Sequence, residues 1–351
     1  MRDRSAVGLV AYRHDRPASA IDEYSRHLVD ALRMAGTAAA YEDGGLSAVL
    51  ARATPPRWIL LQYNPFSYAR WGFAPRLVRD ALGVRRRWPC TPFIVTVHEA
   101  WVPVGDWRSA LMGTYQRAQL RMLLRAADGV IVVRETLAAD LGVTCTQIPV
   151  ASNIAPVAVT RPAARAELGL DGGLVVALFG TGHPSRALDH AEAAIAALAS
   201  ARGGDGVCVL NLGRGSPGIT APPGVEVRTP GALAAADVSR HLRASDVLLV
   251  PFTDGLSTRR TTLMAGLAHG LPVAGLRGDN TDRLLLRHAD ATVMTPCGDP
   301  DAYARAVVAL AADRARLRAV GAAGRRLYER HLDWPVVARM VIDVLERSER
   351  S

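Results

Sequence analysis

Residues 246–276 read DVLLVPFTDGLSTRRTTLMAGLAHGLPVAGL, and this stretch decides the fold. Its short apolar run, Val247–Val250, is typical of a buried parallel strand. A glycine-containing loop over 251–257 follows, and apolar residues then recur at helical spacing up to Gly270, which suits a helix C-terminus. A second apolar strand occupies 272–276. The order strand, loop, helix, strand predicts a βαβ unit.

The loop of this unit is the first candidate for a ligand site. In open α/β sheets, ligands bind outside the C-terminal ends of parallel strands. The N–H groups at a helix start carry partial positive charge and could cradle a phosphate, with arginines adding charge. The residues concerned are Gly255, Leu256, Ser257, Thr258, Arg259 and Arg260. The alternative is an ordinary connecting turn with two solvated arginines.

Chain length and net charge limit the possible protein classes and partners. The 351 residues suit two domains, and a hydrophobic share of 49% fits an α/β protein. The net charge of +9 comes from arginine alone, because the sequence contains no lysine. This bias indicates a GC-rich, bacterial genome, and the dispersed arginines do not favour a nucleic-acid partner. Expected partners are anionic, such as nucleotide diphosphates or an acidic membrane face.

Cysteine spacing and hydropathy suggest the compartment. The cysteines Cys90, Cys145, Cys208 and Cys297 form no CxxC pair, so core thiols are expected rather than metal ligands or disulfides. No apolar run approaches the roughly 18 residues of a spanning helix. We therefore expect a cytoplasmic protein with reduced thiols, at most associated with the inner face of the membrane.

The strand Phe93–Val97 leads to a second candidate site. It ends in His98 and Glu99, with Trp101 close behind. Strand ends of a parallel sheet share one edge, so His98 is the candidate catalytic residue, and Glu99 could orient it or an acceptor hydroxyl. A structural histidine is the alternative.

Two further strand ends carry candidate residues. The strand over 58–62 leads to Tyr63 and Asn64, an aromatic and an amide suited to a sugar ring and its hydroxyls. Packing at a domain surface explains the same residues. The strand Leu174–Phe179 leads to Gly180, Gly182 and Arg186.

The order of strands and helices restarts after the proline-containing turn SNIAPV at 152–157. We therefore predict domains over 1–155 and 156–333. Asp299, Pro300 and Asp301 spell D-x-D, and an N-cap followed by an N1 proline explains them better than a metal site does.

Residues 246–276 resemble the donor-site signature E-G-F-G-x-x-x-x-E-A-x-A-x-G-x-P-V of retaining glycosyltransferase family 4, glycosyltransferase group 1. Asp254 stands at the first Glu, Gly255 and Ser257 at the two glycines. Gly270, Pro272 and Val273 match the closing residues. The second Glu, which holds the nucleotide ribose in the family, falls at Thr262 counted forward or at Ala265 counted back.

Other segments extend the resemblance. The family has G-R-x-x-x-x-K-G after the first strand of its second domain, which places Thr181 at the Arg and Arg186 at the Lys that bind the pyrophosphate. A loop at Thr229 and Gly231 is implied to contact the nucleobase. The helix over 334–351 is implied to pack back on the first domain. The strand ending in His98 and Glu99 also matches the family, where this His lies beside the reacting sugar.

The resemblance implies an α/β protein of the GT-B fold, with two Rossmann-like domains whose parallel sheets face an interdomain cleft. It implies a hexosyl- or related transferase that moves a sugar from a nucleotide diphosphate sugar to an acceptor hydroxyl with retention, without a metal or other cofactor. Asp254 would bind the donor sugar, and the acceptor would be a glycan, glycolipid or natural product. Candidate acceptor-binding residues are His14, Tyr63, Asn64 and Trp101.

Three alternatives stay open. A nucleotide-sugar epimerase or a sugar-phosphate phosphorylase would use the same fold. A non-catalytic GT-B partner or scaffold protein would explain why the second motif Glu is missing.

Overall fold

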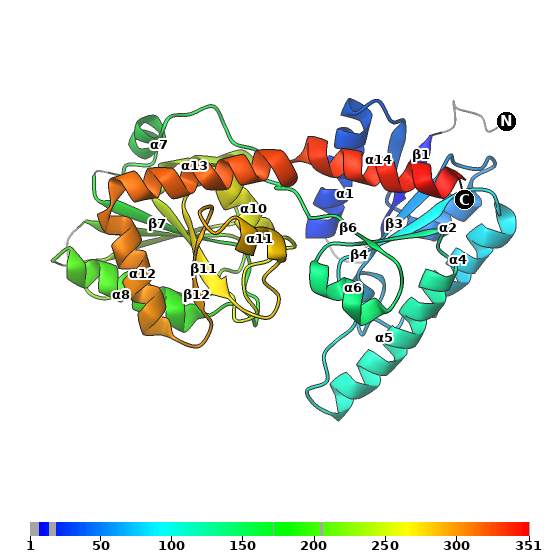
Figure 1. Cartoon of the computed structure of the whole chain (residues 1–351), viewed down its shortest axis with the longest axis horizontal. Coiled ribbons are helices and arrows are strands. Elements are labelled where there is room, and N and C mark those ends of the chain that lie inside the picture. Colours follow the sequence, from blue (N-terminus) through cyan, green and yellow to red (C-terminus); the bar gives the residue numbers. More distant parts are fainter. Residues whose placement is uncertain (1–6, 14–18, 171, 204–205, 351) are drawn as a thin grey trace. The chain divides into compact units, whose positions relative to one another are not determined.

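The computed structural model describes residues 7–13, 19–170, 172–203 and 206–350 (Figure 1). They form two compact units. Unit 1 comprises Met1–Val150 and Trp334–Ser351, and unit 2 comprises Ala151–Asp333. The two units divide after Val150, whereas the sequence predicted a boundary after residue 155. The C-terminal helix belongs to unit 1.

Unit 1 has a parallel sheet, sheet A, whose strands follow the order β2-β1-β3-β4-β5-β6. Its elements are β1 Gly8–Ala11, α1 Ala20–Met34, β2 Ala39–Glu42, α2 Gly45–Ala51, β3 Ile59–Tyr63, α3 Pro65–Tyr68, α4 Pro75–Arg87, β4 Phe93–Val97, α5 Trp107–Arg125, β5 Gly129–Val132, α6 Glu135–Leu141, β6 Thr146–Gln147 and α14 Trp334–Arg350. Strands β3 and β4 are buried along their whole length, because helices cover both faces of a parallel sheet.

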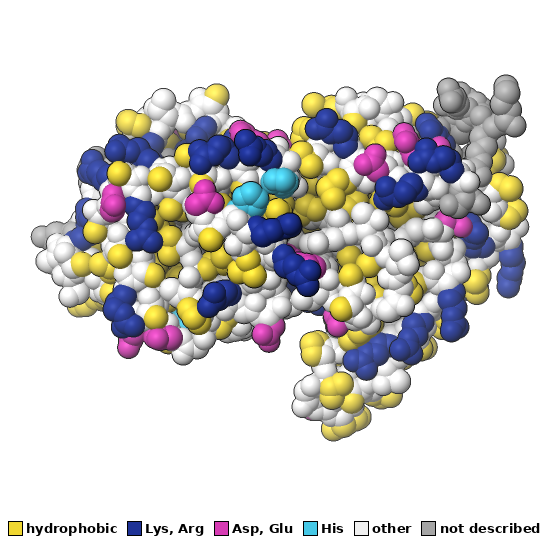
Figure 2. Space-filling model, viewed as in Figure 1, with side chains coloured by type: hydrophobic (Ala, Val, Ile, Leu, Met, Phe, Trp, Pro, Cys, Tyr) yellow, Lys and Arg dark blue, Asp and Glu magenta, His cyan; other side chains and the backbone are white. Residues whose placement is uncertain are grey.

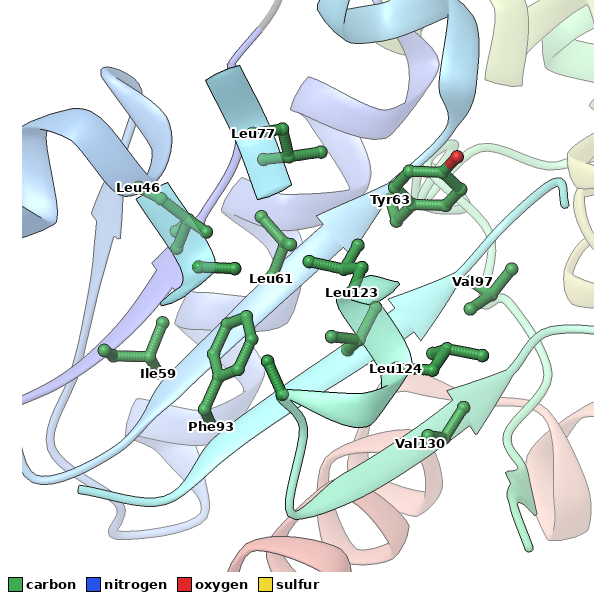
Figure 3. Packing of buried hydrophobic residues seen from close by; sticks show 14 of the residues in the cluster. Leu46, Ile59, Leu61, Tyr63, Leu77, Phe93, Val97, Leu123, Leu124 and Val130 are labelled. Carbon is green, nitrogen blue, oxygen red and sulfur yellow. The ribbon is translucent and has the colours of Figure 1, made fainter. Parts of the chain in front are cut away.

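One core cluster of unit 1 lies between sheet A and the helices α2, α4 and α5. Figure 3 shows Ile59, Leu61 and Phe93 of the sheet pointing toward Leu46 and Leu123 of the helices. All five side chains are nearly inaccessible to solvent. Each such side chain contributes about 1.5–3 kcal/mol by leaving water.

Local sequence signals fix the helix starts in unit 1. The Ser19 hydroxyl accepts a hydrogen bond from the Ile21 N–H at 3.2 Å, so Ser19 is the N-cap of α1. Asn64 caps α3 in the same way, accepting from the Phe66 N–H at 3.0 Å. Asn64 lies directly after β3, so its cap also sets the path of that connecting loop.

Unit 2 has a second parallel sheet, sheet B, in the order β12-β11-β10-β7-β8-β9. Its elements are α7 Arg161–Glu167, β7 Leu174–Phe179, α8 Leu188–Ala201, β8 Val207–Leu212, β9 Glu226–Gly231, α9 Ala235–Ala244, β10 Val247–Val250, α10 Thr261–Ala268, β11 Val273–Arg277, α11 Arg283–Arg287, β12 Val293–Pro296, α12 Pro300–Ala312 and α13 Arg314–His331. The sequence prediction of a βαβ unit over 246–276 is confirmed by β10, α10 and β11.

Close backbone packing holds α13 against α10. A Cβ placed on Gly321 would lie 2.3 Å from the Gly270 carbonyl oxygen, so only glycine fits this position. On the other side of the unit, the Tyr303 hydroxyl of α12 donates to the Ala274 carbonyl of β11 at 2.9 Å. The first contact holds α13 on the end of α10, and the second ties α12 to the sheet. No helix in the described part of the chain is both long and apolar enough to cross a lipid bilayer.

Candidate functional site

The strand order of sheet B defines where a ligand would bind in unit 2. Strand β7 pairs with β8 on one side and with β10 on the other. The chain runs outward through β8 and β9 and then returns to β10, so the connections after β7 and β10 leave the sheet in opposite directions. Ligands of open α/β sheets bind outside the C-terminal strand ends at such a point.

The loops after β7 and β10 are joined by backbone hydrogen bonds. The Ala187 N–H donates to the Pro251 carbonyl at 3.0 Å, and the Thr253 N–H donates to the Ser185 carbonyl at 2.8 Å. Arg186 and Phe252 form an isolated antiparallel bridge between them. The structure therefore brings Arg186 and the turn around Gly255 together at one edge of sheet B.

Asp254 is the centre of a charged cluster in the loop after β10. Arg260 Nη2 lies 2.6 Å from one carboxylate oxygen, and Arg259 Nη2 lies 2.9 Å from the other. Asn280 Nδ2 donates to the same carboxylate at 3.2 Å. Burial acts to raise the pKa of Asp254, but Arg260 and Arg259 outweigh it and lower that pKa. Asp254 is therefore an ionised acceptor at neutral pH.

Arg186 is held by carbonyl groups instead of a carboxylate. Its side chain donates to the Phe179 carbonyl at 3.2 Å and to the Gly180 carbonyl at 3.3 Å, at the C-terminal end of β7. Burial lowers the pKa of Arg186, yet an arginine keeps its proton in proteins. The carbonyl dipoles orient this cation but do not cancel its charge.

The predicted phosphate cradle after Gly255 differs in the structure. The N–H groups of Gly255, Leu256 and Thr258 donate to the Phe252 carbonyl, the Leu276 carbonyl and the Asp282 carboxylate. Ser257 is fully buried, and α10 begins only at Thr261. Three of the four expected donors are thus used inside the fold: Gly255 bonds within its own turn, Leu256 bonds to β11, and Thr258 bonds to Asp282.

Gly255 shows how tight that packing is. It has a φ of +89°, and an added Cβ would lie 2.5 Å from the Gly278 nitrogen. The glycine that the sequence assigned to a ligand is therefore required by the backbone itself.

Thr262 and Ala265, the two positions for the missing motif Glu, lie in different surroundings. The Thr262 hydroxyl donates to the Phe179 carbonyl at 3.1 Å, so this side chain borders the loop after β7. Ala265 is fully buried in α10. The position of the second motif Glu therefore lies beside Gly180 and the candidate site only when it is counted forward from Asp254, which gives Thr262.

The glycine loops after β7 and β8 pack against each other. The Ser216 hydroxyl donates to the Gly180 carbonyl at 3.0 Å, and a Cβ on Gly182 would lie 3.2 Å from the Gly215 carbonyl oxygen. Between two glycines of the second loop stands Arg214, which is exposed. Within the described residues, Arg214 has no hydrogen-bond or ion-pair partner.

Sequence reasoning did not assign Arg214 to the site. Its position between Gly213 and Gly215, directly after a buried strand, was the available signal. Sequence reasoning also missed Ser185, whose hydroxyl accepts from Arg260 at 2.9 Å and hydrogen-bonds His183 Nδ1 at 2.7 Å. Thr229 and Gly231, expected in a loop, lie within β9, because that strand extends to Gly231 and pairs there with Leu212.

In unit 1, His98 lies at the end of β4 as predicted, but its ring is enclosed. Its Nε2 lies 2.7 Å from Gln62 Oε1, and its ring packs edge-on against Tyr24 with centroids 5.3 Å apart. Burial lowers the pKa of His98 to about 4, so the imidazole is neutral near pH 7. A neutral imidazole presents one N–H and one lone pair.

The other unit 1 candidates are only partly brought together. Asn64 Nδ2 donates to Glu99 Oε2 at 3.3 Å, so these two side chains share one edge of sheet A. Tyr63 does not join them as an exposed platform: β3 extends to Tyr63, and its side chain is fully buried in the core. Trp101 is half-buried beneath the Arg117 guanidinium, 4.9 Å from its ring centroid. His14 lies outside the described residues.

A cavity of about 340 Å³ opens at the same edge of unit 1. Its lining includes Arg13, Tyr68, Phe73, Arg76 and Asp80. None of the predicted acceptor residues that the structure describes lines it. Among the described residues, no group of His, Cys, Asp and Glu side chains is arranged to hold a metal ion.

Comparison with known proteins supports the fold and part of the sequence interpretation. Residues 173–313 match the family model "Glycosyl transferases group 1", which covers the loops after β7, β8 and β10. No curated protein matches the sequence.

Several solved structures are similar over almost the whole chain. Sucrose-phosphate synthase from Thermosynechococcus elongatus has a TM-score of 0.71 at 16% identity, over 97% of this chain and 98% of that chain. HepE from Anabaena in complex with UDP-glucose has a TM-score of 0.68 at 12% identity, over 97% and 100%. WaaG, a glycosyltransferase involved in lipopolysaccharide biosynthesis, has a TM-score of 0.63 at 13% identity, over 97% and 99%. The chain therefore has the GT-B fold, and its second unit carries the match to group 1 glycosyltransferases.

Proposed function

We propose that the protein transfers a sugar from a nucleotide diphosphate sugar to an acceptor hydroxyl. The family match covers the three loops at the carboxyl edge of sheet B. The similar HepE structures hold UDP, UDP and glucose, or UDP-glucose. In this proposal, unit 2 binds the donor and unit 1 binds the acceptor.

The observation that carries the proposal is the charge at the end of β7 and β8. Arg186 is oriented by carbonyl groups, and Arg214 is exposed in the adjoining loop. Breaking the glycosidic bond to the diphosphate loads negative charge onto its oxygens, and fixed cations stabilise that charge most in the transition state. A guanidinium group can hold two phosphate oxygens at once. Arg186 and Arg214 would supply this charge without a metal.

In this proposal Asp254 positions the two arginines and also accepts a hydrogen bond from a hydroxyl of the donor sugar. Its carboxylate fixes Arg259 and Arg260 at the mouth of the loop. Among the described residues, its Oδ2 accepts from three donors but its Oδ1 from Arg260 alone, so Oδ1 has a lone pair left for a sugar hydroxyl. This geometry keeps two guanidinium groups from moving freely when the donor leaves.

His98 would contact the reacting sugar as a neutral hydrogen-bonding group. Gln62 fixes one ring nitrogen, and Nδ1 has no hydrogen-bond partner within the described residues. We propose retention of the anomeric configuration, as in the resembled family, and a site of action in the cytoplasm or at the inner membrane face. The half-enclosed cavity beside Arg76 and Phe73 is a candidate place for the acceptor.

Calorimetric titration with UDP, GDP and ADP, each beside its nucleoside, tests the proposal. We expect one diphosphate to bind and its nucleoside to bind far more weakly, because the cations recognise the phosphates. The corresponding nucleotide sugars should then be hydrolysed slowly without acceptor. If no diphosphate binds and no nucleotide sugar is consumed, the transferase proposal is wrong.

A non-catalytic GT-B protein is the second candidate. It is favoured by the internal hydrogen bonds of the Gly255, Leu256 and Thr258 N–H groups and by Thr262 in place of a carboxylate. Such a protein would show no response to nucleotides in the same titration. An epimerase would instead convert a nucleotide sugar without any acceptor and release no diphosphate.

A further inference from the structure

Unit 1 exposes large apolar side chains in two neighbouring segments. Trp71 is 59% exposed in the loop before α4, and Trp107 and Leu111 at the start of α5 are 71% and 60% exposed. Phe73 is exposed to a similar degree. Soluble surfaces rarely gather such side chains unless they contact another surface.

The two segments form one continuous structure. The Tyr115 hydroxyl and Gln116 Nε2 of α5 both donate to the Trp71 carbonyl. Gln119 Nε2 donates to the next carbonyl, that of Gly72, at 3.3 Å. The Phe73 ring packs edge-on against Tyr115 with centroids 5.3 Å apart. These bonds hold the loop on the helix, so its aromatic side chains keep a fixed direction.

Arginine is the main charge around these rings. Arg70 lies 5.5 Å from the Trp71 ring centroid, and Arg108 lies 5.3 Å from that of Trp107. Residues 100–126 contain four arginines and one acid, Asp106, which caps α5. We name the six residues Arg70, Trp71, Phe73, Trp107, Arg108 and Leu111 the aromatic–arginine surface.

Helix α5 arranges the charge along its length. Its exposed positions 107, 111, 114, 118, 121 and 125 follow helical spacing, so they form one stripe. Trp107 and Leu111 begin the stripe, and Arg121 and Arg125 end it. Figure 1 shows one end of α5 projecting beyond the sheet of its unit, and burial of the later helix residues identifies that end as the N-terminal one. Figure 2 shows hydrophobic and arginine side chains together on this projecting part.

We propose that the aromatic–arginine surface docks on an anionic lipid bilayer. Indole rings with an adjacent cation suit the headgroup region, where the ring enters the apolar boundary and the guanidinium binds lipid phosphate. Arg121 and Arg125 extend the same attraction along α5. The excess of arginine over acid in residues 100–126 matches an anionic lipid surface. The proposal concerns unit 1 alone and does not depend on the proposed reaction.

Vesicle co-sedimentation of the full chain tests this proposal. We expect binding to vesicles that contain phosphatidylglycerol and much weaker binding to pure phosphatidylcholine. The double variant Trp107→Ser/Leu111→Ser should lose more than about tenfold in partitioning, since two inserted apolar side chains are removed. The matched control Met34→Ser/Leu286→Ser changes exposed apolar residues elsewhere and should bind normally.

A second pair of variants separates charge from apolar insertion. Arg121→Gln/Arg125→Gln should weaken binding by about fivefold for each arginine, and by less at high salt. Arg202→Gln, an exposed arginine in unit 2, is the control. Circular dichroism checks that each variant is folded.

Three results would overturn the proposal: equal binding to neutral and anionic vesicles, unchanged binding of Trp107→Ser/Leu111→Ser, or self-association through Trp107 without vesicle binding. The last would assign the surface to a protein partner.

Discussion

Arg214 differs from Arg259 and Arg260 in its electrostatic surroundings. The latter two share the Asp254 carboxylate, whereas Arg214 has no acidic partner within the described residues. Replacing Arg214 with Ala should weaken nucleoside diphosphate binding by about tenfold or more, because a charge-assisted hydrogen bond contributes about 1.5–3 kcal/mol. Isothermal titration calorimetry measures the change.

Two comparisons make the Arg214 prediction specific. Arg202→Ala removes an exposed arginine of the same unit and should leave the affinity unchanged. Binding of the free nucleoside should be equal in Arg214→Ala and the unmodified protein. If both ligands weaken together, Arg214 supports the loop and does not contact phosphate.

Gly213 is a residue whose replacement should destabilise unit 2. It has a φ of +128°, and an added Cβ would lie 2.5 Å from the Gly180 carbonyl oxygen. Gly213→Ala should reduce the free energy of unfolding by about 1–3 kcal/mol through strain and steric overlap. Urea unfolding followed by circular dichroism measures this loss.

Gly215 supplies the control, because it lies in the same loop with a φ of +62° and no atom within 4 Å of an added Cβ. Gly215→Ala should reduce the free energy of unfolding by a smaller amount, because alanine there is strained only by the left-handed backbone conformation. Equal losses in the two variants would contradict the predicted overlap with Gly180.

Helix α12 allows a direct test of the D-x-D segment. The Asp299 carboxylate accepts from the Ala302 N–H at 2.8 Å, which confirms the predicted N-cap. Asp299→Ala should reduce the free energy of unfolding by about 1 kcal/mol, since it removes the cap. Asp301→Ala, in the first turn without a capping bond, should change it much less. A loss of Mn²⁺ binding in either variant would favour the metal site instead.

Long elements with clear periodicity could be predicted from sequence. Strands β4, β7 and β10 have the predicted bounds, because each is an apolar run between polar, proline or glycine residues. The short β2 and β12 were missed, since their residues, AAYE and VMTP, do not form a continuous apolar run as those of β10 do. The helical pattern over 302–318 also does not reveal that α12 stops at Ala312. Asp313 then caps α13 by accepting from the Ala315 and Arg316 N–H groups, within a run of alanine and arginine that continues the helical pattern.

At the scale of the whole molecule, sequence predicted where the candidate site lies better than how its charges pair. The strand ends that carry Arg186, Asp254 and His98 follow from the alternation of strands and helices. The pairing of Asp254 with Arg259 and Arg260 depends on a non-helical turn, which residue spacing does not reveal. The N–H groups of Leu256 and Thr258 bond to Leu276 of β11 and to Asp282, which only tertiary packing brings close.

In each unit, a buried histidine with a lowered pKa makes the stability depend on pH. Burial lowers the pKa of His98 in unit 1 and of His269 in unit 2 to about 4. The unfolded chain therefore binds protons that the folded state excludes. The stabilisation is complete above the unfolded pKa of about 6.5 and is lost as the pH falls toward 4, by about 1–3 kcal/mol per histidine.

Tryptophan fluorescence can separate the two units in this experiment. All six tryptophans lie at positions assigned to unit 1: 58, 71, 88, 101, 107 and 334. His98→Asn should flatten the pH dependence of urea unfolding monitored by fluorescence, because the group that takes up the proton is gone. His269→Asn should leave the unfolding transition seen by fluorescence unchanged. It should flatten only the pH dependence of the transition of unit 2, which circular dichroism detects. If His269→Asn alters the fluorescence transition equally, the two units unfold together, and the histidines cannot be assigned to separate transitions.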